Sequence, residues 1–186
     1  PLWVLTGLFV LSASVSIIAL RQNNQKMVEL RNAVYEADRN GGDVNTALNN
    51  LRAHVHSHMN TDLSSGNNIK PPVQLKYSYE RLQAQEQARV ASINQRVYTE
   101  AQAHCERLNP GSVSGRVRVP CVEEYVNANG EKPKQIPPSL YQYDFVSPSW
   151  SPDLAGWSLV VTGLLFIALA GGFITDRVIK NRLSHL

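Results

Sequence analysis

Two long apolar stretches, at 2–20 and 154–175, contain no charged residue. At a helical rise of about 1.5 Å per residue, stretches of this length cover the roughly 30 Å of a bilayer's hydrocarbon core. The alternative is a pair of buried helices in a soluble protein. It is disfavoured because each helix would be apolar on every side in a chain too small to surround it. We therefore expect two transmembrane helices.

The first apolar stretch has a second interpretation. Its apolar run leads into the small-residue sequence SASVS, as in a secretory signal with its cleavage site. The run then resumes through Ile17 and Ile18 to Leu20, which brings it to the length of a span. This continuation favours an uncleaved anchor.

Between the spans, apolar residues recur at helical spacing in three segments. The first continues the leading span as a stalk to about residue 39, where NGGD supplies a turn and Asp43 an N-cap. The second carries a stripe from Val44 to Met59, and the third a stripe from Val73 to Leu108. The pattern predicts a helical hairpin and one long helix, whose apolar faces need one another or a partner for burial.

Glu86 interrupts the third stripe, and we expect either contact with water there or a salt bridge, for example to an arginine of the hairpin. Beyond residue 108, turn-forming residues and prolines replace the helical pattern. A short helix is expected at 120–127. The five prolines of 130–153 favour an extended strap that returns the chain to the second span.

The expected fold is an all-α membrane protein. Two transmembrane helices bracket an exported three-helix domain, made of the hairpin and the long helix, with an extended proline-rich return strap. The expected divisions are a first span at 2–20, an exported helical domain at 21–108, a disulfide-tethered loop and strap at 109–153, a second span at 154–175, and a basic cytoplasmic tail at 176–186.

Charge beside the second span sets the expected orientation. The tail carries Arg177, Lys180 and Arg182 against one acid, Asp176, and short basic flanks stay in the cytoplasm. Both termini are then inside, and residues 21–153 lie outside the cytoplasmic membrane. This segment holds 15 basic and 14 acidic residues, which argues against a nucleic-acid partner.

The two cysteines, Cys105 and Cys121, both fall in the exported segment. A disulfide between them would close a loop whose constraint contributes about 3 kcal/mol of stability in an oxidising compartment. A shared metal is the alternative. It is weaker because neither cysteine belongs to a CxxC pair, and only His104 stands nearby as a third ligand.

Three histidines alternate in the sequence HVHSHM, at His54, His56 and His58. On a strand all three would face one way and suit zinc, whereas on a helix only His54 and His58 share a face. The flanking pattern is helical, so we expect a polar helix face. A zinc site completed by His104, or a proton-sensing cluster, remains an alternative.

Two further sets of residues point to the bilayer. Small residues four apart, which let transmembrane helices approach closely, are Ser12 with Ser16 and Ala168 with Gly172. Aromatic residues that suit the membrane–water boundary precede or begin the second span at Tyr141, Tyr143, Trp150 and Trp157. Packing of some of them on the helical bundle is the alternative.

The chain shows no nucleophile elbow, no HExxH and no glycine-rich phosphate loop. The adjacent Glu123 and Glu124 would diverge by about 100° on a helix and could not easily share a substrate. We therefore expect a protein without catalytic activity and without an obligatory cofactor.

The order of span, exported helices, span and inward tail resembles the sensing half of bacterial chemoreceptors and sensor kinases. Only 11 residues follow the second span, too few for a signalling domain, so direct signal output is not expected. We expect a scaffold or interaction protein of a bacterial-type envelope that binds a protein partner or a second copy of itself. The alternative is a sensor of a small ligand or metal that signals through a separate membrane partner.

Overall fold

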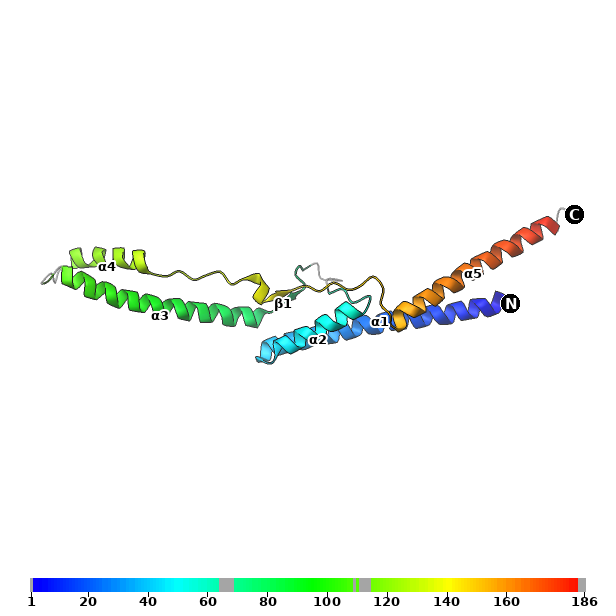
Figure 1. The fold of residues 1–186 in the computed structure, drawn as a ribbon, viewed down its shortest axis with the longest axis horizontal. Helices are drawn as coiled ribbons and strands as arrows, with labels where there is room; N and C mark the ends of the chain where they lie inside the picture. The colour runs from blue at the N-terminus through cyan, green and yellow to red at the C-terminus, as the bar shows by residue number, and fades with distance from the viewer. Residues whose placement is uncertain (1, 64–68, 109, 111–114, 184–186) are drawn as a thin grey trace. The chain divides into compact units, whose positions relative to one another are not determined.

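A computed structural model describes residues 2–63, 69–108, 110 and 115–183. The described chain is mostly helical, in keeping with the expected all-α class (Figure 1). Its elements in chain order are α1 (Leu2–Asn40), α2 (Val44–Ser57), β1 (Val73–Gln74), α3 (Lys76–Leu108), α4 (Gly115–Asn129), the 3₁₀ helix η1 (Pro138–Leu140), β2 (Gln142–Tyr143) and α5 (Leu154–Leu183).

The chain divides into two compact units. Unit 1 comprises Pro1–Gln74 and Gln142–Leu186, and unit 2 comprises Leu75–Tyr141. The hairpin helix and the long helix, which the sequence placed in one domain, therefore belong to different units. Parts of the expected loop (64–68), link (109 and 111–114) and tail (184–186) lie outside the described residues.

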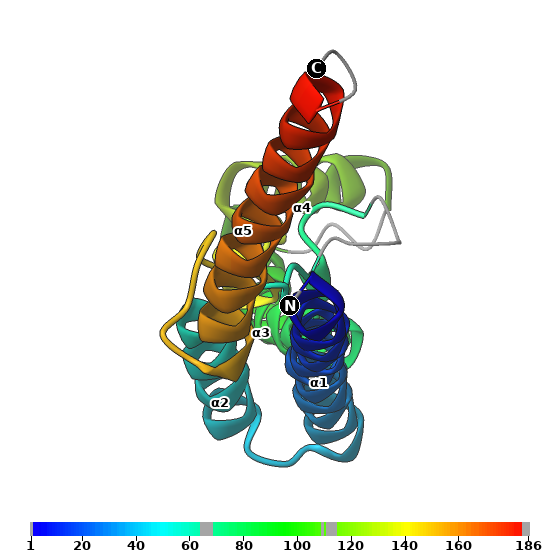
Figure 2. The ribbon, with the colours of Figure 1, turned by 90° about the vertical axis from the view of Figure 1, so that its right-hand side faces the viewer.

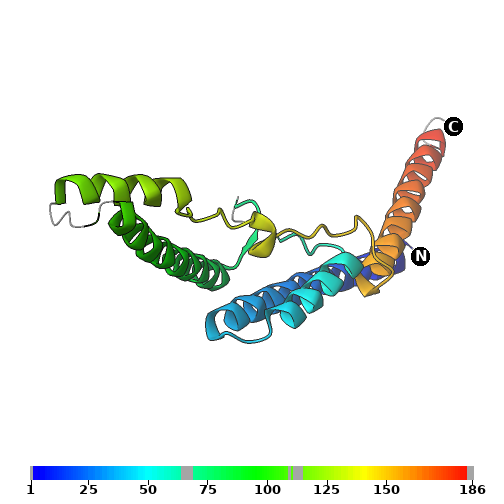
Figure 3. The ribbon, with the colours of Figure 1, turned by 60° about the vertical axis from the view of Figure 1, so that its left-hand side comes forward.

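In unit 1, α1 and α5 are the two helices of the described chain that are long and apolar enough to cross a membrane. They run antiparallel (Figures 1 and 3), and the residues along their contact recur at alternating steps of three and four. This spacing is the heptad pattern of helices that pack knobs into holes. We call the contact the span seam. Its residues are Leu2, Leu5, Phe9, Ser12, Ser16 and Ala19 of α1, and Ala155, Ser158, Thr162, Leu165, Leu169 and Gly172 of α5.

The outer half of α1 forms a hairpin with α2, and the two lie side by side in Figure 2. Gly41 adopts a left-handed backbone with φ 67°, and the Asp43 carboxylate accepts a hydrogen bond from the Thr46 amide at 3.0 Å, which caps α2 as expected. The hairpin core consists of Met27 and Val34 of α1 and Leu48, Leu51 and Val55 of α2.

Helix α2 ends at Ser57, two residues before the end of the predicted stripe. His58 is extended and Asn60 is left-handed with φ 60°, so the chain turns before Met59 can join the helix. The strand pair explains a second difference. Because Val73 and Gln74 pair antiparallel with Tyr143 and Gln142, α3 begins at Lys76 rather than at Val73.

In unit 2, α4 lies antiparallel against the end of α3, and the segment after α4 runs back along α3 to η1 (Figures 1 and 3). The predicted stripe of α3 is covered at Val90, Val97 and Ala101, whereas Leu108 at its end is exposed. Helix α4 begins at Gly115, earlier than the predicted 120–127, and contains Pro120 within it.

Candidate functional site

Three chain segments of unit 1 meet at the start of α5, and Asp153 joins them. One oxygen of its carboxylate, Oδ1, accepts hydrogen bonds from the Gly156 amide and the Ser151 hydroxyl, each at 2.9 Å. The other oxygen, Oδ2, accepts from the Asn23 side chain of α1 at 2.8 Å. Asp153 therefore caps the N-terminus of α5 and fastens it to α1.

The turn after α2 completes the arrangement. The Met59 amide donates to the Ser151 hydroxyl at 3.0 Å, and the Asn60 side chain donates to the Leu20 carbonyl of α1 at 3.1 Å. Ser151 is 0% exposed, so its hydroxyl is available only to these protein groups. We call Asn23, Asn60, Ser151 and Asp153 the cap cluster.

The electrostatics of the cap cluster favour an ionised Asp153. Burial acts to raise the pKa of this carboxyl, but hydrogen bonds from Gly156, Asn23 and Ser151, together with the charge of His58, outweigh it and hold the pKa below its ordinary value. The α5 N-terminus also favours a negative charge at this position.

Gly156 allows the close approach on which the cap depends. A Cβ atom at this position would collide with the Ser151 carbonyl oxygen and would lie 2.8 Å from the Trp150 indole nitrogen. The indole rings of Trp150 and Trp157 meet edge to face above it, with centroids 5.7 Å apart. A side chain at residue 156 would therefore displace both the cap and this aromatic pair.

The three histidines of HVHSHM do not converge. His54 and His58 stack with ring centroids 4.3 Å apart, and the His54 Nε2 atom lies 3.0 Å from the Asn23 carbonyl oxygen. His56 is exposed and lies edge-on to Phe145 at 6.1 Å. His54 lies on α2 and His58 is the extended residue that follows the helix, and these two rings stack while His56 lies apart from them.

His104 lies on α3 in unit 2, where its ring is 5.2 Å from that of Tyr125 on α4. Among the residues that the structure describes, no three histidine, cysteine or carboxylate groups are grouped so that they could hold a metal ion. The polar groups of the cap cluster are hydrogen-bonded to one another or to the backbone, an arrangement that fastens helices together.

The aromatic residues expected at the membrane boundary occupy different places. Trp150 and Trp157 flank the first turn of α5, whereas Tyr143 lies in β2 opposite Val73. Tyr141 belongs to unit 2, where its ring lies 4.7 Å from that of Tyr79 on α3.

Hydroxyl groups join α1 and α5 across the span seam. The Thr162 hydroxyl lies 2.8 Å from that of Ser12 and 3.1 Å from that of Ser16, and it donates to the Ser158 carbonyl of its own helix. Gly172 lies against Leu2, whereas Ala168 is exposed on the outside of the pair. The two predicted serines and Gly172 are therefore seam residues, and Ala168 is not.

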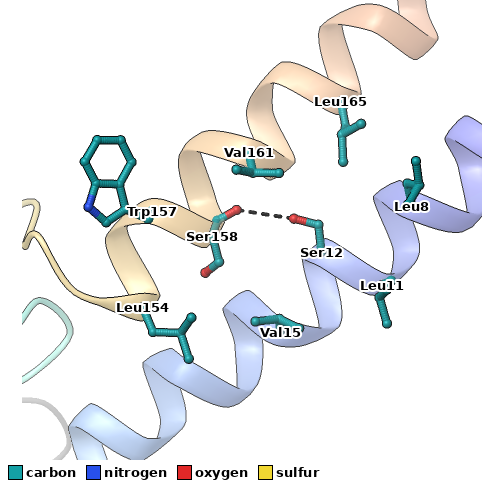
Figure 4. Close-up of a pocket in the computed structure, with 9 residues that line it drawn as sticks. All are labelled: Leu8, Leu11, Ser12, Val15, Leu154, Trp157, Ser158, Val161 and Leu165. Atoms are coloured by element: carbon teal, nitrogen blue, oxygen red, sulfur yellow. Dashed lines mark hydrogen bonds between the residues drawn. The ribbon is translucent and has the colours of Figure 1, made fainter.

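An apolar groove of about 510 Å³ runs beside the seam between α1 and α5 (Figure 4). Its walls are aliphatic and indole side chains, except for Ser12 and Ser158. These two hydroxyls are already engaged, with Thr162 and with the Ala155 carbonyl, so the groove presents carbon to whatever fills it.

In unit 2, Cys105 and Cys121 form a disulfide that joins α3 to α4. Further along α3, Arg89 donates to Glu86 of its own helix and to Glu131 beyond α4, each at 2.8 Å. The hydrogen bond from Arg89 is the main cause that lowers the pKa of Glu86 to about 2, and it also lowers the pKa of Glu131. The partner expected for Glu86 on the hairpin is thus replaced by Arg89.

Sequence reasoning missed the cap cluster. Asn23 and Asp153 are 130 residues apart, and neither belongs to a recognisable motif. The local signal was the sequence SPDLAG before the second span, in which Asp153 stands at an N-cap position three residues before Gly156. Comparisons with protein-family models, curated proteins and solved structures found no match to this chain.

Proposed function

We propose that the chain is a membrane-anchored interaction protein of a bacterial-type envelope, which presents residues 21–153 outside the cytoplasmic membrane to a protein partner. Helices α1 and α5 are its spans, and unit 2 is the presented part. The proposal assigns it binding rather than catalysis.

The orientation is supported by charge and by redox chemistry. Arg177 and Lys180 follow the second span, as is typical of a cytoplasmic flank, while Trp150 and Trp157 stand at its other end. The Cys105–Cys121 disulfide in unit 2 suits an oxidising compartment. With α5 oriented in this way, residues 21–153 lie outside the cytoplasm.

The observation that carries the proposal is a set of three exposed apolar side chains where α3 ends and α4 begins. Leu108 is 61% exposed, Val117 is 50% exposed and Val119 is 54% exposed. The disulfide and the ion pair between Glu106 and Arg118, at 3.2 Å, hold the two helices together at this point. We call these three residues the α3–α4 tip. Val117 and Val119, two residues apart on α4, point to different sides of that helix. Large exposed apolar side chains on a rigid support are typical of protein-binding surfaces.

The test places a photo-crosslinking amino acid at residue 117 of the full chain in intact cells, with residue 140 as the matched control. Leu140 is also apolar and 50% exposed in unit 2, but it lies in η1 away from the α3–α4 tip. We expect one discrete adduct from position 117, none from position 140, and loss of the adduct when Leu108→Asp is added.

Equal adducts from positions 117 and 140, or an adduct that survives Leu108→Asp, would contradict binding through the α3–α4 tip. The mass of the adduct separates a second copy of this chain from another protein. Circular dichroism of each purified variant checks that its helices are intact.

One observation favours the sensor as a second candidate. The stacked pair His54 and His58 lies next to Asp153, which caps the second span, so a ligand on the histidines would act close to α5. The test is zinc affinity of the full chain beside a variant with His54, His56 and His58 replaced by glutamine. Stoichiometric binding that the variant loses would support the sensor, and equal affinities would contradict it.

A further inference from the structure

Both connections to unit 2 pass through the strand pair of unit 1. The chain leaves for unit 2 after Gln74 and returns at Gln142, and these two residues are partners in the β1–β2 ladder. A displacement of either connection is therefore shared by both strands before it reaches the rest of unit 1.

From β2, residues 144–153 lead directly to the cap cluster, and this segment is tied to the end of α2 on the way. Phe145 lies against His56, and the Ser147 hydroxyl donates to the Asp62 carboxylate at 2.8 Å. On the other strand's side, the Tyr35 hydroxyl of α1 donates to the Pro72 carbonyl at 3.1 Å. The strand pair is thus linked to α1, α2 and α5.

The cap cluster is where these links end. Ser151 is shared, because its hydroxyl accepts from the Met59 amide of the α2 turn and donates to Asp153 at the head of α5. Asn60 holds the same turn to α1 through the Leu20 carbonyl and does so with a left-handed backbone. Asparagine adopts this conformation more readily than most non-glycine residues, which suits Asn60 to the turn that follows α2.

We propose that the cap cluster is a coupling joint: the last turn of α2 and the first turn of α5 open and close as one unit, so that a displacement of the strand pair acts on both spans together. The joint works through Asp153, since the carboxylate that caps α5 is the same one that holds Asn23 of α1. The inference concerns unit 1 alone and does not rest on what the α3–α4 tip of unit 2 binds.

The experiment measures amide hydrogen exchange of the full chain in lipid nanodiscs at Val55 in α2 and at Gly156 and Trp157 in α5. The informative variant is Asn60→Gly, which removes the bond to Leu20 but tolerates the positive φ and touches no residue of α5. If the turns open together, exchange at all three amides rises by about fivefold, the effect of one lost hydrogen bond.

Two further variants frame the result. Ser151→Ala removes the shared hydroxyl and should raise exchange at the same three amides at least as much. Thr46→Ala weakens the cap at the opposite end of α2 and should leave Gly156 and Trp157 unchanged. An increase in Asn60→Gly that stays within α2 and its turn, with Gly156 and Trp157 at wild-type rates, would overturn the joint.

Discussion

The span pair α1–α5 and the pair α3–α4 hold two antiparallel helices together by different chemistry. Across the span seam, small residues and the hydroxyls of Ser12, Ser16 and Thr162 lie among leucine and phenylalanine side chains. In unit 2 a disulfide joins the helices, and the charged group of Glu86, Arg89 and Glu131 ties α3 to the chain beyond α4.

The proposed position of α1 and α5 in a membrane, with unit 2 in water, accounts for the difference. Lipid tails are as apolar as leucine, so helices in a bilayer gain little from hiding apolar side chains and rely on close approach and hydrogen bonds. In water, apolar burial is favourable, and the buried apolar residues of α3 are Val90, Val97, Ala101 and Cys105. A covalent link compensates for that small core.

The largest expected effect is on unit 2. Replacing Cys105 and Cys121 by alanine removes the link between α3 and α4 and should lower the stability of unit 2 by about 3 kcal/mol. Proteolysis of the full chain should then cut within α4 first, while the spans remain resistant. Equal protease resistance of α4 with and without the disulfide would contradict the claim that this bond stabilises the α3–α4 pair.

The next effect falls on unit 1. Gly156→Ala places a methyl group against the Ser151 carbonyl and should cost about 1–3 kcal/mol, the range for overpacking. Thermal unfolding in detergent measures it. Gly163→Ala is the matched control, because nothing lies within 4 Å of a Cβ there. A control that destabilises as much as Gly156→Ala would remove the steric explanation.

A smaller effect is expected within the span seam. Thr162→Val keeps the shape of the side chain but removes the hydroxyl that meets Ser12 and Ser16, at a cost of about 0.6 kcal/mol. Thr175→Val is the control, because its recorded bond is to Gly171 of its own helix. Unfolding in mixed micelles should separate the two variants, and identical curves would count against interhelical hydroxyl bonding.

The smallest effect concerns acid. The pKa of Glu86 is lowered from 4.5 to about 2, so its contribution to the stability of unit 2 is complete above about pH 4.5 and is lost as the pH falls toward 2. Unfolding midpoints of the wild type should decline over this interval, and those of Glu86→Gln should decline less. Parallel declines would show that Glu86 does not stabilise unit 2 through Arg89.

The local sequence pattern predicted where the helices lie better than it predicted which elements pack against them. The cap at Asp43, the turn at Gly41 and the long apolar stretches each depend on neighbouring residues, and the structure has α1, α2 and α5 where these signals placed them. The stripe of α3 predicted a buried face but could not say what covers it. The covering residues come from α4 and the segment after it.

The candidate site was less predictable because its contacts cross long stretches of chain. The apolar stripe placed Val73 in a helix. Its pairing with Tyr143 in a strand depends on tertiary structure, which the local pattern does not contain. The bond between Asn23 and Asp153 leaves no periodic trace in the sequence. The helical spacing brought His54 and His58 together, but it did not predict that His58 would follow the end of α2 with an extended backbone.

The central claim is that unit 2 lies outside the cytoplasmic membrane between two spans. The most direct test treats intact cells with a reductant and a thiol reagent, neither of which crosses membranes, and scores labelling of Cys105 and Cys121. A Val178→Cys variant lacking both native cysteines serves as the cytoplasmic control. We expect labelling of Cys105 and Cys121 before lysis and of residue 178 only after it, and the reverse pattern would contradict this topology.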